Sequence, residues 1–429
     1  MLLISFALAS EPSIPFETYT LDNGLKVILS PDTSVPFVWV DVWYQVGSKD
    51  EEPGRSGFAH LFEHLMFQGS AHADDDYFQP LQQIGAQVNG NTTLDRTNYF
   101  EGVPSRYLPL ALFLESDRMG WLDDVLTTSK LDNQRDVVRN ERRQRYETPP
   151  YGEAWPKLLE SVWPAGHPYH IATIGKHEDL QAATLADATA FFNRWYLPNN
   201  AVLSVVGDYD PATIKDQVKT WFGDVPRGPD PVKTVAAPVT LTAQKVVRVE
   251  KDVPFPSLWM SWITPPLLQP GDAELDLYAN YLAGGVDAPL YKALVRDLKI
   301  AQDVSAYQGS QQLGSMFTIQ ATAAAGHTVE ELAAAIDTVL TQTLATPMSA
   351  EDLQIARTTY EVGFWDGLSS ISGKATQLVQ YMSLTGDPGY LARDLARYQS
   401  ATTDGVATAA RTWLPLDRRV ILQFVPVKK

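Results

Sequence analysis

The sequence contains no cysteine, so disulfides, thiolate metal ligands and a thiolate nucleophile are all excluded. Any metal ion must therefore be held by imidazole and carboxylate groups. Apolar runs of the roughly 20 residues that cross a bilayer are also absent. Basic residues are scarce, with 34 Lys and Arg against 51 Asp and Glu and a net charge of −17. Because nucleic-acid binding needs a concentrated basic face, this balance argues against a nucleic-acid partner.

The first ten residues, MLLISFALAS, form a short apolar stretch that closes on small residues. Residues 1–10 thus resemble the end of a secretory signal, although the basic segment that starts such signals is missing. We predict an exported, periplasmic protein. The alternative is a cytoplasmic protein with an apolar N-terminal strand.

At 429 residues the chain exceeds the size of one ordinary domain. Residues 224–244 contain four prolines, which stiffen a chain and prevent a helix, so this segment reads as a linker. The sequence therefore predicts an N-terminal domain over residues 11–223 and a C-terminal domain over residues 245–429.

The two sides of the linker resemble each other. Residues 184–195 and 402–413 both run from a threonine to a tryptophan. The pairs Leu197-Pro198 and Leu414-Pro415 follow, each before a closing strand. The tryptophans Trp195 and Trp413 are 218 residues apart, about half the chain. We predict an internal duplication into two α/β halves. The alternative is chance similarity between two amphipathic helices that precede strands.

The local pattern alternates strands and helices. Residues 17–31 read as a hairpin, and residues 36–46, rich in valine and aromatics, read as a strand. A helix is expected after Ser56, which is a candidate N-cap, and further helices over residues 107–124 and 131–146.

The most informative stretch is His60-Leu61-Phe62-Glu63-His64. On a helix, residues four apart face the same way, so both imidazoles can reach one metal ion. Glu63 lies beside them and is placed to accept a proton from a metal-bound water without being a ligand. The alternative, a coincidental pair of helix histidines, is disfavoured by the apolar residues that would hold this helix in a core.

Catalytic zinc usually takes three protein ligands and leaves one position open. Residues 135–142 offer a candidate third ligand, but spacing alone does not choose among the many carboxylates of this chain.

With these motifs the chain resembles the pitrilysin family of zinc peptidases, of the half-size type that includes the mitochondrial processing peptidase subunits. In that family a segment similar to residues 135–141 supplies the third ligand, which implies Glu141, 77 residues after His64. The resemblance also implies an α+β fold: two homologous α/β domains, each a mostly antiparallel sheet with helices packed on it, with zinc bound by one of them.

Residues 85–92 resemble the edge strand on which the family binds its peptide. The resemblance implies substrate contacts at Asn89, Gly90 and Asn91, while an Asn-rich turn and strand is the alternative. In the second half, residues 284–296 resemble a family stretch whose arginine, here Arg296, holds the substrate over the zinc. No second H-x-x-E-H occurs there, which agrees with a family in which one half carries metal.

This sequence departs from the family pattern at two places. Gln134 stands where many members have a second acidic residue, and an amide can hydrogen-bond a water but cannot take up its proton. Asp303 stands where the family has a tyrosine seven residues after the arginine. The nearest tyrosine, Tyr307, lies four residues further, which we expect to be one helical turn too far.

The motif and the resemblance predict a zinc endopeptidase. The resemblance also implies that two such chains enclose the substrate, which would be a short or unfolded peptide. The missing tyrosine favours a heterodimer, with a homologous subunit that supplies the Arg/Tyr pair, over a homodimer. Two alternatives remain: a non-catalytic structural or assembly subunit, as in respiratory complexes, and a dedicated maturation protease for one precursor peptide.

Overall fold

A computed structural model describes residues 13–73 and 76–427 of the chain. Two sheets organise these residues, one in each half of the chain. The strands are β1 (Glu17–Thr20), β2 (Lys26–Pro31), β3 (Phe37–Tyr44), β4 (Gln87–Thr92), β5 (Thr97–Pro104), β6 (Ala201–Gly207), β7 (Lys245–Lys251), β8 (Ser257–Thr264), β9 (Ala301–Gly309), β10 (Ser315–Ala323) and β11 (Val420–Pro426).

The two sheets share one topology. The first has the strand order β1-β2-β6-β3-β5-β4 and the second the order β7-β11-β8-β10-β9. With β1 set aside, the orders match strand for strand, and in each sheet the first two strands are parallel while the other pairs are antiparallel. The expected α+β fold with an internal duplication is confirmed.

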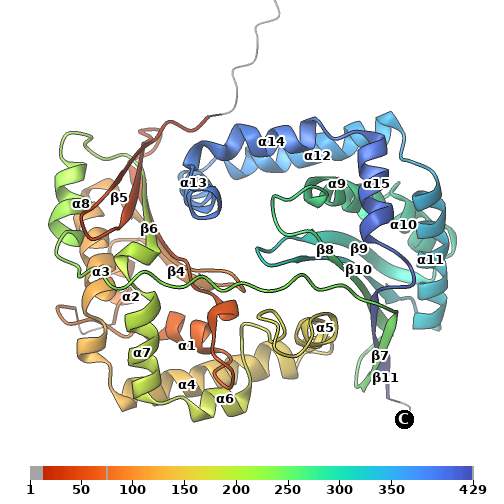
Figure 1. Cartoon of the computed structure of the whole chain (residues 1–429), viewed down its shortest axis with the longest axis horizontal. Coiled ribbons are helices and arrows are strands. Elements are labelled where there is room, and N and C mark those ends of the chain that lie inside the picture. The colour runs from red at the N-terminus through yellow and green to blue at the C-terminus, as the bar shows by residue number, and fades with distance from the viewer. Residues whose placement is uncertain (1–12, 74–75, 428–429) are drawn as a thin grey trace, which may run out of the picture.

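Helices cover the sheets (Figure 1). In the first half, α3 packs on the central strands and α8 on α3. In the second half, α9 and α11 pack on the sheet. The helices are α1 (Phe58–Leu65), α2 (Phe78–Gln83), α3 (Leu108–Trp121), α4 (Thr128–Arg142), α5 (Ala154–Val162), α6 (His177–Ala182), α7 (Leu185–Trp195), α8 (Ile214–Phe222), α9 (Asp272–Ala283), α10 (Pro289–Tyr291), α11 (Val329–Ala345), α12 (Ala350–Gly367), α13 (Ile371–Thr385), α14 (Leu391–Gln399) and α15 (Thr403–Trp413).

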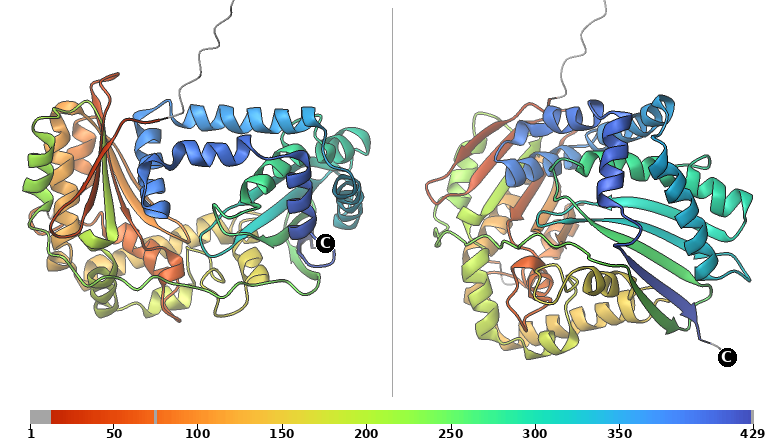
Figure 2. Two further views of the ribbon diagram at one scale, coloured as in Figure 1. Left: turned by 45° about the horizontal axis from the view of Figure 1, so that its top comes forward. Right: turned by 45° about the vertical axis from the view of Figure 1, so that its right-hand side comes forward.

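In each half, one helix packs on the sheet of the other half. Helix α13 of the second half lies beside the first sheet (Figures 1 and 2), where its buried Leu378 and Val379 pack on Trp39 and Trp43 of β3. Helix α5 of the first half packs in the same way on β8 and β11. The two helices occupy equivalent places in the chain, so the exchange follows the duplication.

The local sequence predictions fare well. The expected hairpin is β1 paired with β2, and the expected strand and two later helices are β3, α3 and α4. The segment between α8 and β7 contains no helix or strand and runs across from one half to the other (Figure 1). The exact domain limits stay a prediction.

The expected signal remnant, residues 1–10, lies outside the described residues. Among the residues that the structure describes, no helix combines the length and apolar character needed to cross a membrane. Export therefore stays a prediction.

Candidate metal centre

Helix α1 begins at a glycine, so the expected serine cap is wrong. The N-cap is Gly57, with a left-handed φ of 87°, and a Cβ there would lie 2.9 Å from a carbonyl oxygen of a neighbouring loop. The hydroxyl of Ser56 instead donates to the carboxylate of Asp179 at 2.5 Å. Glu51 takes over the cap, because its two carboxylate oxygens accept the backbone N–H groups of Gly57 and Ala59 at 3.0 and 2.8 Å.

The apolar face of α1 fixes the direction of the polar one. Phe58, Leu61, Phe62 and Leu65 are buried in the core of the first half. The three polar residues of the motif therefore project from the remaining side of the helix, which faces α4 and the strand β4.

Helix α4 completes a three-residue cluster. The Nε2 atoms of His60 and His64 lie 3.8 and 3.3 Å from one carboxylate oxygen of Glu141. Among the described residues these three form the group of potential ligands whose donor atoms all lie within 4.8 Å of one another. The structure thus brings together the two histidines of the motif and the glutamate that the resemblance implied.

The cluster has the composition and spacing that zinc requires. A tetrahedral ion with bonds of about 2.1 Å to nitrogen and oxygen separates its ligand atoms by about 3.4 Å, close to the two distances that join Glu141 to the histidines. Two imidazoles and one carboxylate are also a known catalytic donor set, which leaves one coordination position open. These residues could hold one zinc ion after small side-chain adjustments.

The charge states of the cluster suit a cation. Burial, with a further effect from His64, lowers the pKa of His60 to about 4, so its imidazole is neutral at neutral pH. Burial alone would raise the pKa of Glu141. Its hydrogen bond with His64 and the charges of His60 and Arg145 outweigh burial and lower it. The cluster therefore offers the neutral imidazole of His60 and the carboxylate of Glu141 to a cation.

Arg145 is a neighbour that the sequence did not single out. Its guanidinium lies 2.8 Å from the second carboxylate oxygen of Glu141, one helical turn further along. This contact leaves the other oxygen directed at the histidines. The i, i+4 spacing is the signal that could have found it.

Glu63 lies between the cluster and strand β4. Its carboxylate oxygen Oε2 accepts a hydrogen bond from the hydroxyl of Thr92, at 2.5 Å. Burial raises the pKa of Glu63, and the hydrogen bond from Thr92 partly opposes that rise. A raised pKa on a carboxylate beside a candidate metal centre is the property of a general base that works near neutral pH.

Strand β4 is an edge strand, because within the described ranges it pairs with β5 alone. Its residues alternate in exposure. Asn89 and Asn91 are exposed, whereas Gly90 faces α1, where an added Cβ would lie 3.1 Å from Cγ of Glu63. The free edge beside Glu63 can accept an extended peptide as a further strand. The substrate roles of these three residues stay predictions.

Gln134 lies on the face of α4 that carries Glu141. Seven residues separate them, which is almost two helical turns, or about 10 Å along the helix axis. Gln134 is buried, with 7% of its surface exposed. Its proposed support of catalysis stays a prediction.

The second-half candidates are arranged differently from the expectation. The guanidinium of Arg296 pairs with the carboxylates of Asp287 and Asp297 at 2.9 and 3.3 Å. Asp303 and Tyr307 do not lie on a helix, so the expected offset of one helical turn is wrong. Both are in β9, opposite residues of β10, and because side chains alternate along a strand they share one face of the sheet.

The chain is similar in sequence to known peptidases. Residues 26–169 match the model of Insulinase (Peptidase family M16), and residues 182–360 match the model of the Peptidase M16 inactive domain. The chain is 27% identical over 371 residues to the zinc protease PqqE of Helicobacter pylori, across 85% of this chain and 83% of the relative.

A solved structure titled as a protease from Helicobacter pylori superposes with a TM-score of 0.88, at 25% identity, over 97% of this chain and all of that one. A more distant relative is human cytochrome b-c1 complex subunit 1, 26% identical over 270 residues, which cover 62% of this chain and 55% of the relative. A duplicated α+β fold with one helix that carries an H-x-x-E-H motif is that of a half-size pitrilysin-type protein. The chain belongs to the M16 peptidase family.

Proposed function

We propose that this chain is a zinc-dependent endopeptidase that hydrolyses short or unfolded peptides. The observation that carries the proposal is the convergence of His60, His64 and Glu141 on one point beside the partly buried carboxylate of Glu63. The name of the relative PqqE, a zinc protease, supports the same reading.

The residues have distinct roles in this reaction. His60, His64 and Glu141 would hold the ion, which when bound polarises the scissile carbonyl and lowers the pKa of a nearby water. Glu63 accepts the proton of the attacking water and delivers it to the leaving amine. The edge of β4 holds the peptide in an extended form, so that its scissile bond lies beside Glu63.

The purified protein is expected to carry one zinc per chain and to cleave unstructured peptides, because all of the proposed ligands and the base are present. Metal analysis and a peptide-cleavage assay, each before and after treatment with a chelator, check this. Activity should vanish with the chelator and return on addition of zinc. A protein without zinc, or cleavage that a chelator leaves unchanged, would refute the proposal.

We also propose that the active form pairs this chain with a homologous subunit, and that the two enclose the peptide. In the family an arginine and a tyrosine hold the substrate, but here Arg296 is engaged by two aspartates and Asp303 stands in place of the tyrosine. A carboxylate repels a developing oxyanion, and losing one such donor costs about 10²–10³ in rate.

The isolated chain is therefore expected to cleave peptides slowly, and addition of its co-purified partner should raise kcat by about 10²-fold or more. A homodimer assayed at the same concentration is the comparison. Full activity from the isolated chain, unchanged by any partner, would show that Tyr307 or another donor of this chain replaces the missing tyrosine.

An assembly subunit is the competing function, and the similarity to cytochrome b-c1 complex subunit 1 is what favours it. The intact ligand cluster favours the peptidase, because a purely structural role does not require it. A dedicated maturation protease would differ from both, since it would cleave one precursor and leave unrelated peptides intact.

A further inference from the structure

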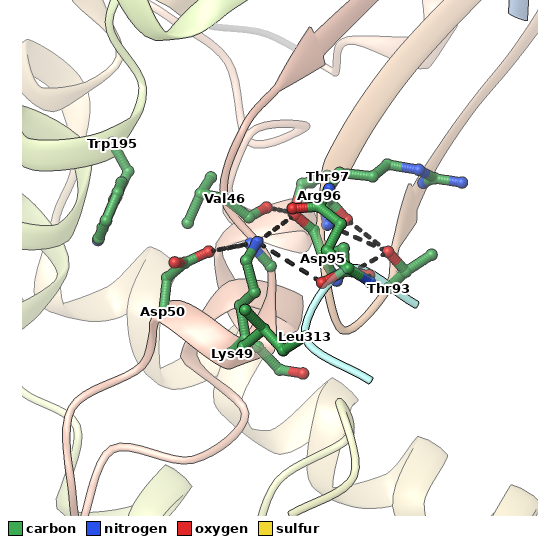
Figure 3. A network of polar contacts seen from close by, with 12 residues as sticks. Val46, Lys49, Asp50, Thr93, Asp95, Arg96, Thr97, Trp195 and Leu313 are labelled. Carbon is green, nitrogen blue, oxygen red and sulfur yellow. Dashed lines mark hydrogen bonds and ion pairs between the residues drawn. The ribbon is translucent and has the colours of Figure 1, made fainter. Parts of the chain in front are cut away.

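The four-residue turn between β4 and β5, Thr93–Arg96, is anchored by a buried aspartate. Asp95 is 7% exposed. The Lys49 ammonium donates to the backbone carbonyl of Asp95 at 2.6 Å and lies 3.2 Å from the carboxylate of Asp50 (Figure 3). The hydroxyl of Tyr169 donates to the Asp95 carboxylate at 2.5 Å. The turn is thus fixed to the first half by charged, buried contacts.

The second half contributes the remaining contacts of this anchor. The connection between β9 and β10 reaches across to the turn, where the backbone N–H of Gln312 donates to the other carboxylate oxygen of Asp95 at 3.0 Å. The next N–H, from Leu313, donates to the hydroxyl of Tyr169 at 2.9 Å. Asp95 is therefore a point at which a loop of the second half is hydrogen-bonded to a loop of the first half.

Arg96, the last residue of the turn, connects the turn to strand β4. The guanidinium of Arg96 donates to the backbone carbonyl of Asn91 at 2.9 Å and to the side chain of Asn98 on β5 at 2.7 Å. Arg96 also lies 4.6 Å from the ring centre of Trp43 on β3. These contacts connect the turn to the end of β4, to β5 and to β3.

The last residue of β4 contacts the proposed base. The hydroxyl of Thr92 donates to Oε2 of Glu63, and Gly90, two residues earlier on the same face, lies against the Glu63 methylene group. Strand β4, which is also proposed to receive the peptide, thus contacts the flexible Glu63 side chain at both its carboxylate and its methylene group. With Oε2 bound to Thr92, Oε1 remains for the reacting water.

We propose that Thr92 is the positioning residue of Glu63, and that the second half sets the place of Thr92 through Asp95. The inference rests on the proposed function. A general base acts only within hydrogen-bond reach of the proton that it removes, and a misplacement of about 1 Å can cost about 10²-fold in rate. The contact between the two halves thereby becomes a requirement for turnover as well as for stability.

The test uses the zinc-loaded full-length chain with its partner. Thr92→Val keeps the shape of the side chain and removes the hydroxyl, so kcat should fall about 10- to 100-fold with KM and zinc content unchanged. Thr92→Ser should restore most of the activity. Thr18→Val, at an exposed position on β1, is the matched control. In a Glu63→Gln background, Thr92→Val should add no further loss.

Asp95→Ala should also lower kcat without loss of zinc, and should add little to Thr92→Val because both act through one contact. Full kcat in Thr92→Val, or equal losses in the valine and serine variants, would overturn the proposal. Crystal structures of the zinc-loaded wild type and Thr92→Val decide it independently of turnover. A Glu63 carboxylate that keeps its orientation without the hydroxyl overturns the positioning role, whereas a peptidase-inactive wild type refutes only the proposed function.

Discussion

Replacing Glu63 with glutamine is expected to lower kcat by about 10²–10⁴-fold, the contribution of a general base, while zinc content stays at one ion per chain. Glutamine has nearly the same shape as glutamate. Its side-chain carbonyl oxygen can still accept the hydrogen bond that the Thr92 hydroxyl donates to Oε2 of Glu63 in the wild type. The amide cannot take the proton of the attacking water. The three proposed ligands are unchanged, so the metal should be retained.

Steady-state kinetics on an unstructured peptide, together with metal analysis of the same sample, measure both quantities. Glu160→Gln, at an exposed position on α5, is the matched control and should behave as wild type. Cleavage by Glu63→Gln within a few-fold of the wild-type rate would show that another group removes the proton.

Replacing Glu141 with glutamine is expected to act in the opposite order, on the metal first. The variant loses the carboxylate that lies 3.3 Å from His64 and 3.8 Å from His60. It also leaves the guanidinium of Arg145, now 2.8 Å from that carboxylate, as an unbalanced positive charge beside the ion. Because even residues that only support a ligand contribute 10–100-fold to metal affinity, we expect zinc affinity to fall by about 100-fold or more.

Competition with a chromogenic chelator measures this affinity directly. The activity of Glu141→Gln should recover in part at high zinc concentration, whereas Glu63→Gln should not recover at any. Asp136→Asn, on the exposed face of α4, is the matched control. Unchanged zinc affinity in Glu141→Gln would assign the third ligand elsewhere.

The contrast between these two variants shows what the sequence could establish about the site. His60, Glu63 and His64 are close in the chain, so helix periodicity alone places them on one face. Glu141 lies on another helix, and only the family resemblance selected it among many acidic residues. Thr92 was missed because it contacts Glu63 through the packing of β4 on α1, and local patterns do not encode that packing.

Some features of the fold could likewise be predicted from the sequence, and others could not. The repeated segments that end in Trp195 and Trp413 predicted the duplication, and turn residues and β-rich runs predicted the first strands. The placement of α5 and α13 could not be predicted, since each packs on the sheet of the opposite half. Their amphipathic patterns indicate that each helix buries an apolar face, but they do not indicate against which sheet that face packs.

The exchange of these two helices has the form of a domain swap, with both copies joined in one chain. Separate copies could part on dilution. The proline-rich segment between α8 and β7 instead acts as a tether, and a short tether holds two modules at an effective concentration of about a millimolar. The loop of the second half that contacts Asp95 therefore stays close to it. The position of Glu63 in one copy can depend on the other copy, and this dependence does not vary with protein concentration.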